Sequence, residues 1–120
     1  LPKPGTFEHV KTYQWLSFVA SDLHPAYSPL FGDDLSTEAQ KEAETKVSDL
    51  LKIADQELAG KKFITGDTFT IADAYLFTVF GWSSHVGIDT SSFKNLNEFS
   101  SRVYQRPAVQ AVMKREGLLK

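Results

Sequence analysis

The sequence contains no cysteine among its 120 residues. That absence excludes disulfides, thiolate nucleophiles and zinc sites built on sulfur, and it suits a protein of a reducing compartment. Any thiol chemistry must therefore come from another domain or another molecule. The histidines His9, His24 and His85 show no i, i+4 pairing and no matching acid cluster, so we expect no metal site.

The sequence also has only a small excess of one charge over the other, and it has no long apolar run. With 13 basic and 15 acidic residues the net charge is -2, which gives no positive surface for a nucleic-acid backbone or an anionic membrane. No apolar run approaches the ~18 residues of a membrane helix, and the N-terminus lacks the regions of a signal peptide. We therefore expect a cytoplasmic domain without a nucleic-acid or membrane partner.

Apolar residues recur at helical spacing, whereas no segment shows sustained two-residue alternation. With 42% hydrophobic residues the chain can build one independent core. The sequence predicts an all-α bundle of about five or six helices. The predicted buried stripes are Tyr13, Leu16, Ala20 and Leu23; Ala43, Val47, Leu50, Leu51, Ala54 and Leu58; and Leu96, Phe99 and Val103.

Prolines and capping residues mark the predicted helix boundaries. His24-Pro25 should kink or break the first helix, because proline lacks an N–H and disfavours the α conformation in the residue before it. Thr37 with Gln40 predicts the start of the next helix through reciprocal side-chain bonds. Pro107 can open the last helix, where the first-turn N–H needs no partner.

The stretch 68-TFTIADAYLF-77 predicts a helix start of a particular kind. Thr70 and Asp73 fit a capping box, and the Asp73 charge lies in the first turn, where the helix dipole favours an anion. Apolar residues follow on nearly every side, which predicts a central buried helix starting near Thr70. A catalytic Asp73 is the alternative, but the capping pattern favours a structural role.

Three segments together resemble the C-terminal domain of cytosolic glutathione transferases, most closely the bacterial beta class. They are 66-GDTFTIADAYLF-77, 13-YQWLSFVASDLHPAYSPLF-31 and 102-RVYQRPAVQAVMKREGL-118. The resemblance covers essentially the whole chain. It implies that residues 1–5 are the remnant of an interdomain linker and that 6–120 form the helical domain. A thioredoxin-like N-terminal domain, which holds most of the glutathione site in that family, would lie outside this chain.

The same resemblance implies an activity for the intact protein. It would be an enzyme that conjugates glutathione, as a co-substrate, to hydrophobic electrophiles, or that uses glutathione as a thiol reductant. No covalently bound cofactor is implied. This chain would supply part of the electrophile pocket and of a homodimer interface, and would be inactive alone. The alternative is a non-catalytic dimerisation or protein-assembly module, as in some relatives of these enzymes.

The resemblance also nominates residues for glutathione. His24 would approach its sulfur and is the candidate catalytic residue of this chain, although a histidine at a helix C-terminus can equally bond the last carbonyls. Ser17 and Asp22 fall where family members place polar groups that reach the glutathione of the partner subunit. Without the resemblance, both would be read as solvated side chains.

Four apolar residues are candidate walls of the electrophile pocket, because apolar substrates need concave aromatic surface with few polar anchors. Core packing is the alternative for each, and it is the more favoured one for the two on the buried helix. A serine–histidine dyad at Ser83, Ser84 and His85 is excluded, because adjacent helical residues do not face one another. The four candidates are Tyr27, Leu30, Tyr75 and Trp82.

Overall fold

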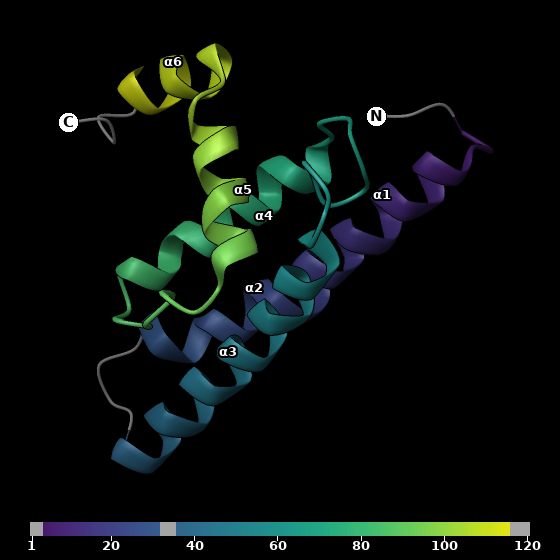
Figure 1. Ribbon diagram of the computed structural model, residues 1–120. Helices are drawn as coiled ribbons and strands as arrows, with labels where there is room; N and C mark the ends of the chain where they lie inside the picture. Colours follow the sequence, from purple (N-terminus) through teal and green to yellow (C-terminus); the bar gives the residue numbers. More distant parts are fainter. Residues whose placement is uncertain (1–3, 32–35, 116–120) are drawn as a thin grey trace.

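The computed structural model describes residues 4–31 and 36–115, most of which are helical (Figure 1). Within these ranges no strand forms, and a single isolated β-bridge joins Phe63 to Gly66. The predicted all-α class is confirmed. Most of the predicted linker 1–5 lies outside the described residues. The elements are α1 (Phe7–Phe18), the π-helical turn η1 (Val19–Leu23), α2 (His24–Tyr27), the 3₁₀ turn η2 (Ser28–Phe31), α3 (Thr37–Leu58), α4 (Ile71–Gly81), the 3₁₀ turn η3 (Trp82–Ser84), α5 (Lys94–Tyr104) and α6 (Pro107–Arg115).

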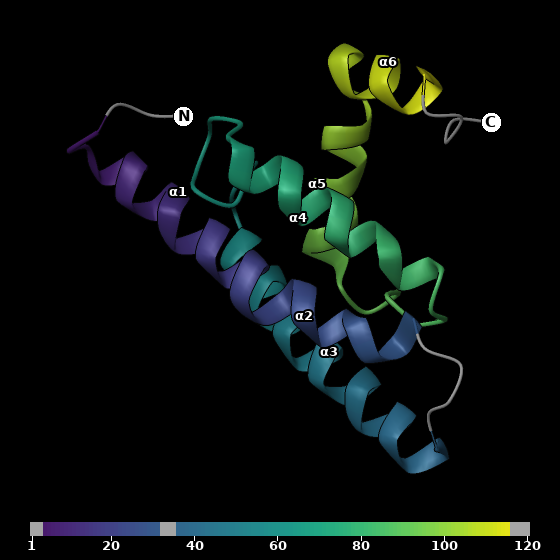
Figure 2. The ribbon, with the colours of Figure 1, turned by 180° about the vertical axis from the view of Figure 1, so that it is seen from behind.

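The helices form one bundle with α4 in its middle. The run α1, η1, α2 and η2 is one continuous helical segment, and α3 runs back beside it in the opposite direction (Figures 1 and 2). Helix α4 packs against α1 and η1 and also against α5, while α6 packs on α5 at the end of the bundle. No helix in the described ranges is long and apolar enough to cross a membrane.

The interruption predicted at His24-Pro25 is a widened turn. The His24 N–H bonds the carbonyl of Val19, five residues back. In a regular α-helix the Pro25 ring would clash with the carbonyl of Ser21, four residues before it. Proline also has no backbone N–H, so it could not donate a hydrogen bond to that carbonyl. The π turn η1 relieves that clash without ending the helix.

The predicted buried stripe of the first helix was wrong at two of its four residues: Leu23 is buried and Leu16 is half-buried against the core, but the other two are exposed. Tyr13 is 51% exposed and Ala20 is also exposed. This helix is apolar on more than one side, so the α-helical period alone could not select the buried side. The wide turn η1 then keeps residues four apart on one face. The side that is buried carries Thr12, Trp15, Val19, Leu23 and Tyr27.

Helix α3 starts one residue earlier than predicted. Its N-cap is Ser36, whose hydroxyl oxygen accepts the N–H of Ala39 over 3.1 Å, and the predicted cap Thr37 is the first helical residue. Both residues can cap, and only backbone geometry separates them. The stripe predicted for this helix is confirmed at Val47, Leu51, Ala54 and Leu58, which are at most 1% exposed, whereas Ala43 and Leu50 are half-buried.

Helices α4 and α6 begin where the sequence predicted, and α5, for which only a buried stripe was predicted, begins at Lys94. The α5 stripe of Leu96, Phe99 and Val103 is fully buried, and α6 opens at Pro107. The Asp55 side chain on α3 accepts the N–H of Leu96 over 2.9 Å, so α3 caps the first turn of α5. One side of α4 remains open in this chain, and Ile71 on that side is 47% exposed.

Candidate functional site

The N-terminus of α4 carries the predicted capping box. Thr70 is its N-cap residue and has an extended backbone, and Asp73 is the third residue of the helix. The Thr70 N–H donates to Oδ2 of Asp73 over 2.8 Å, and the Thr70 hydroxyl donates to the same oxygen over 3.2 Å. The Asp73 carboxylate thus accepts two bonds from Thr70, and it forms the arm of the box that returns from the third helical residue to the N-cap.

Asp73 also bonds outside its own helix. Its Oδ1 accepts the N–H of Ile64 over 2.7 Å, across the loop that joins α3 to α4. Burial raises the pKa of the Asp73 carboxyl above its ordinary value of 3.8, and the bonds from Ile64 and Thr70 and the charge of Arg106 act against that rise. The side chain is fully buried and both of its oxygens accept bonds within the chain, which is a structural arrangement.

The loop from α3 to α4 also contacts α5 and the short connection between α5 and α6. Arg102 donates to the carbonyls of Lys61 and Lys62 over 3.1 and 3.0 Å. The guanidinium of Arg106 lies 4.1 Å from the centre of the Phe69 ring, a cation–π distance. These contacts hold the start of α4 in place, and they therefore fix the position of the side chains farther along the helix.

His24, Tyr75 and Trp82 come together beside α4. Nδ1 of His24 lies 2.5 Å from the Tyr75 hydroxyl oxygen, which joins residues 51 apart in the sequence. The Trp82 ring approaches the imidazole edge-on, with ring centres 4.8 Å apart. All three side chains are half-buried. The structure thus assembles one polar group and two aromatic rings at a partly open surface.

Phe31, which the sequence did not single out, extends this surface. Its ring centre lies 5.6 Å from that of Trp82, and the residue is 53% exposed. The available signal was its place next to Leu30 at the end of the first helical segment. Leu30 itself is half-buried and packs against the core. We call His24, Phe31, Tyr75 and Trp82 the aromatic cluster.

Tyr27 lies behind the aromatic cluster. The residue is 0% exposed, its hydroxyl is 2.6 Å from Oγ of Ser83, and its ring meets Trp82 edge-on at 5.9 Å. Burial raises the pKa of Tyr27 to about 12, with the Ser83 bond acting against the rise. In this chain Tyr27 packs in the core, the alternative that the sequence left open, and it supports Trp82 from behind.

Ser17 and Asp22 lie on a different surface. Both line a hollow of about 490 Å³ between the α1–η1 segment and α3, and His24 is not among its lining residues. The three glutathione candidates therefore do not form a single site within this chain. The polar side of the hollow also includes Ser21, which the sequence analysis did not single out. Its spacing of one helical turn from Ser17 was the signal that could have identified it. The lining residues are Gln14, Trp15, Ser17, Phe18, Ser21, Asp22, Leu50 and Ile53.

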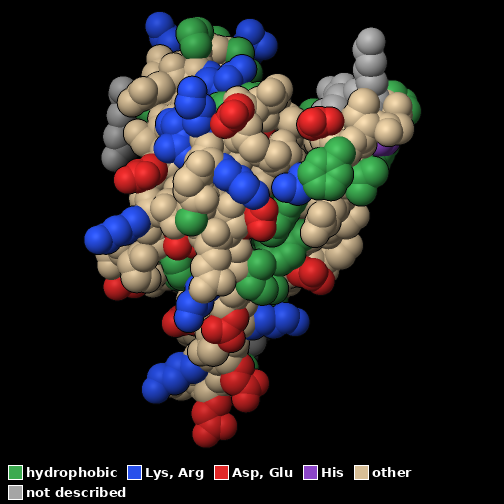
Figure 3. All heavy atoms as spheres, turned by 45° about the vertical axis from the view of Figure 1, so that its right-hand side comes forward, with side chains coloured by type: hydrophobic (Ala, Val, Ile, Leu, Met, Phe, Trp, Pro, Cys, Tyr) green, Lys and Arg blue, Asp and Glu red, His purple; other side chains and the backbone are tan. Residues whose placement is uncertain are grey.

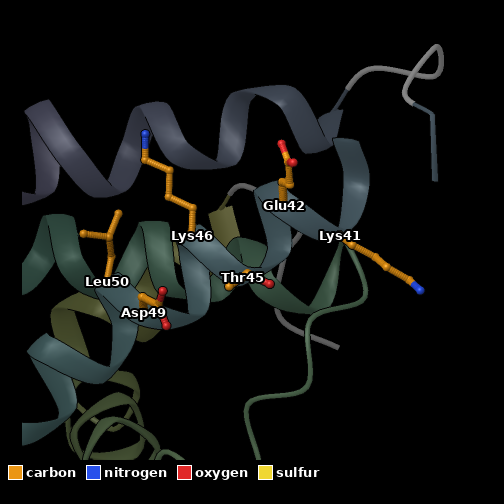
Figure 4. Close-up of a pocket in the computed structure, with 6 residues that line it drawn as sticks. All are labelled: Lys41, Glu42, Thr45, Lys46, Asp49 and Leu50. Atoms are coloured by element: carbon orange, nitrogen blue, oxygen red, sulfur yellow. The ribbon is translucent and has the colours of Figure 1, made fainter. Parts of the chain in front are cut away.

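A second hollow, of about 440 Å³, follows the first half of α3 (Figure 4). Lys41, Glu42, Lys46 and Asp49 line it together with Thr45 and Leu50, so its two positive and two negative charges balance. None of these residues is buried. This hollow has the character of a solvated helix face. In the part of the chain that the structure describes, no group of three or more acidic or histidine side chains could hold a metal ion.

Comparison with known proteins identifies the family. Residues 12–107 match the model of the glutathione S-transferase C-terminal domain. The chain belongs to this family. The match runs from the buried Thr12 on α1 to the start of α6, and so includes η1, the capping box and the aromatic cluster.

Bacterial glutathione S-transferases are similar to this domain in sequence and structure. One from Xanthomonas campestris is 38% identical over 112 residues, which cover 88% of this chain and 55% of that protein. The beta-class enzyme of Sphingomonas chungbukensis is 43% identical with a TM-score of 0.90, over 98% of this chain and 59% of that one. A sphingomonad enzyme solved with glutathione is 38% identical, again with a TM-score of 0.90, over 98% and 59%. The chain thus spans little more than half the length of these relatives.

Proposed function

We propose that this glutathione S-transferase C-terminal domain belongs to an active glutathione transferase and forms the apolar part of its acceptor site. Support comes from the bacterial relative that is named a glutathione S-transferase and from the solved neighbour that is complexed with glutathione. The reacting thiol would be that of glutathione, the co-substrate, because this chain contributes no cysteine of its own. The domain would bind and orient the electrophile.

The aromatic cluster is the observation that carries this proposal. Sites for apolar small molecules combine aromatic surface with a few placed polar groups. Here Phe31 and Trp82 offer half-open rings, and His24 with Tyr75 offers the polar group. Leu30 would extend the apolar wall. An electrophile lying on these rings would be held beside a sulfur that approaches His24.

The domain would raise the reaction rate by position and hydrogen bonding. In conjugation the sulfur of glutathione forms a bond to the electrophilic carbon, and a leaving group departs with its electron pair. Holding both reactants in reach replaces a bimolecular encounter by an arrangement close to the transition state. A donor at His24 would stabilise the anionic sulfur, and the rings would exclude water from the reacting atoms.

Ser17 and Asp22 fit a second part of the proposal. They line an open hollow away from the aromatic cluster, where they would meet the glutathione of a partner subunit in a homodimer. Helix α1 also exposes apolar side chains, with Phe7 at 71%, Val10 at 60% and Tyr13 at 51%. Apolar side chains gather on the side of the molecule seen in Figure 3. This side would be covered in a dimer of the complete protein.

The test is glutathione binding by the complete protein, measured by calorimetry, together with conjugation of glutathione to an activated aryl chloride. We expect binding and turnover for the complete protein and neither for this 120-residue chain alone. A complete protein that dimerises but has no affinity for glutathione would overturn the proposal and favour an assembly module.

A further inference from the structure

The imidazole of His24 is fixed on one side and open on the other. Tyr75 contacts it twice, through the hydroxyl at 2.5 Å from Nδ1 and through ring centres 5.8 Å apart at 88°. The Trp82 ring meets it at 4.8 Å and 77°. Among the described residues, Nε2 of the same ring has no hydrogen-bond partner. The ring orientation is thus set by α4 and η3, with Nε2 left for a ligand.

The π turn directs His24 to this place. In a regular α-helix each residue turns the chain by about 100°, so residue 24 would lie roughly 140° around the axis from Val19. The bond from the His24 N–H to the Val19 carbonyl instead widens the turn and brings His24 closer to the side of Val19, which is 1% exposed and faces the core. Since η1 packs on α4, the imidazole reaches Tyr75. Pro25, which prevents a regular helix here, therefore helps to aim His24.

The bond at Nδ1 decides what Nε2 can do. A neutral imidazole has one N–H and one lone pair, so the nitrogen that accepts a bond leaves the proton on the other nitrogen. If the Tyr75 oxygen accepts from Nδ1–H, Nε2 presents a lone pair and repels an anion. If the Tyr75 hydroxyl donates to Nδ1, Nε2 presents an N–H. Only the second direction gives an anionic sulfur a donor from neutral His24.

We propose that Tyr75 is a positioning residue for His24: its hydroxyl donates to Nδ1 and fixes the tautomer that carries the proton on Nε2, which then donates to the sulfur of glutathione. This inference rests on the proposed function. The proton stays on Nε2, and His24 acts by donating a hydrogen bond. Tyr75 acts through His24, because its hydroxyl is occupied by Nδ1.

The first test is a double-mutant cycle in the complete protein. Tyr75→Phe keeps the ring and removes the hydroxyl, and one hydrogen bond of about 0.5–1.5 kcal/mol corresponds to a loss of about 2–10-fold in kcat/KM. In a His24→Ala background the same change should have no effect. Tyr104→Phe, on the outer side of α5, is the control and should match the unchanged protein. A loss of the same size with and without His24, or no loss at all, contradicts the proposal.

The second test needs no activity. Long-range ¹H–¹⁵N spectra of the complete protein at a pH where His24 is neutral should show Nε2 protonated and Nδ1 unprotonated and hydrogen-bonded. In Tyr75→Phe the Nδ1 resonance should move, and a fraction of the other tautomer should appear. Protonated Nδ1 in the unchanged protein overturns the proposal. If the protein binds no glutathione, the function fails, and this spectrum still decides the role of Tyr75.

Discussion

Asp73 at the start of α4 and His24 beside its middle are both polar groups against the same helix, but their surroundings differ. Asp73 is fully buried, and both oxygens accept bonds from the chain itself. His24 is half-buried, one nitrogen is bonded to Tyr75, and the other is open. A saturated buried group holds the fold together, whereas a fixed but unsaturated group among aromatic rings can bind a ligand. Burial and hydrogen-bond saturation therefore separate the structural role of Asp73 from the ligand-binding role that we propose for His24.

The largest effect is expected from Asp73→Ala. The change leaves the buried donors of Ile64 and Thr70 without an acceptor, at about 1–3 kcal/mol each, so we expect the free energy of unfolding to fall by about 2–6 kcal/mol. Urea unfolding of the domain measures this loss. Asp73→Asn, which keeps the shape and one acceptor, should lose less.

The comparison requires that Asp73 affect the fold and leave the ligand alone. Glutathione affinity of the complete protein, measured well below the melting temperature of the variant, should stay unchanged in Asp73→Ala. Unchanged stability with lost glutathione affinity would reverse the roles assigned to the two ends of α4.

His24→Ala should show the opposite behaviour. A hydrogen bond to a charged sulfur is worth about 1.5–3 kcal/mol, so kcat/KM of the complete protein should fall by about 10–100-fold. Stability should change little, since the half-buried ring leaves no charged group unpaired. His85→Ala, at an exposed histidine, is the matched control and should leave both quantities unchanged. A large drop in stability with normal turnover would make His24 structural.

Features that depend on residues close together in the sequence could be predicted better than contacts between distant segments. The spacing of Thr70 and Asp73 predicted the capping box. The apolar stripe of Leu96, Phe99 and Val103 predicted the buried face of α5. Each depends on residues within a few turns of one helix, where backbone geometry is regular. The family resemblance then indicated the glutathione S-transferase C-terminal domain, which is confirmed, whereas the place of His24 beside glutathione stays a prediction.

Contacts between distant segments could not be predicted. His24 meets Tyr75 across 51 residues, and Tyr27 meets Ser83 across 56. Their partners depend on how α4 packs against the first helical segment, and the π turn η1 rotates that segment by an amount that no propensity gives. The failed stripe prediction at Tyr13 has a different cause, because α1 is apolar on more than one side and its period alone does not select the side that packs on α4.

Tyr27 is a second buried polar group whose hydrogen bond is made within the chain, and Tyr27→Phe tests its structural role through the pH dependence of stability. Burial raises the pKa of Tyr27 from 10.0 to about 12, so the unfolded chain loses this proton first. The stabilising contribution is complete below pH 10 and is lost as the pH rises toward 12. We expect the variant to lose stability less steeply than the unchanged domain over this range, measured by denaturant midpoints.

At neutral pH the same variant should lose about 1–2 kcal/mol, because the buried Ser83 hydroxyl has no partner. The double variant Tyr27→Phe with Ser83→Ala removes both groups and should recover part of that loss. Equal slopes above pH 10 for the variant and the unchanged domain would show that Tyr27 does not stay protonated.

The smallest effect on stability is expected at the N-cap of α3. Because this cap is exposed, it shows the contribution of capping without that of burial. Ser36 accepts the N–H of Ala39 as Asp73 accepts that of Thr70, but it lies at the surface. Ser36→Ala should therefore cost about 1 kcal/mol, since water can replace the lost acceptor. Thr37→Ala, one residue later, should stay within about 0.5 kcal/mol because Thr37 is not the cap. The difference between Asp73→Ala and Ser36→Ala then measures what burial adds to a cap, and equal losses would remove the distinction on which the comparison rests.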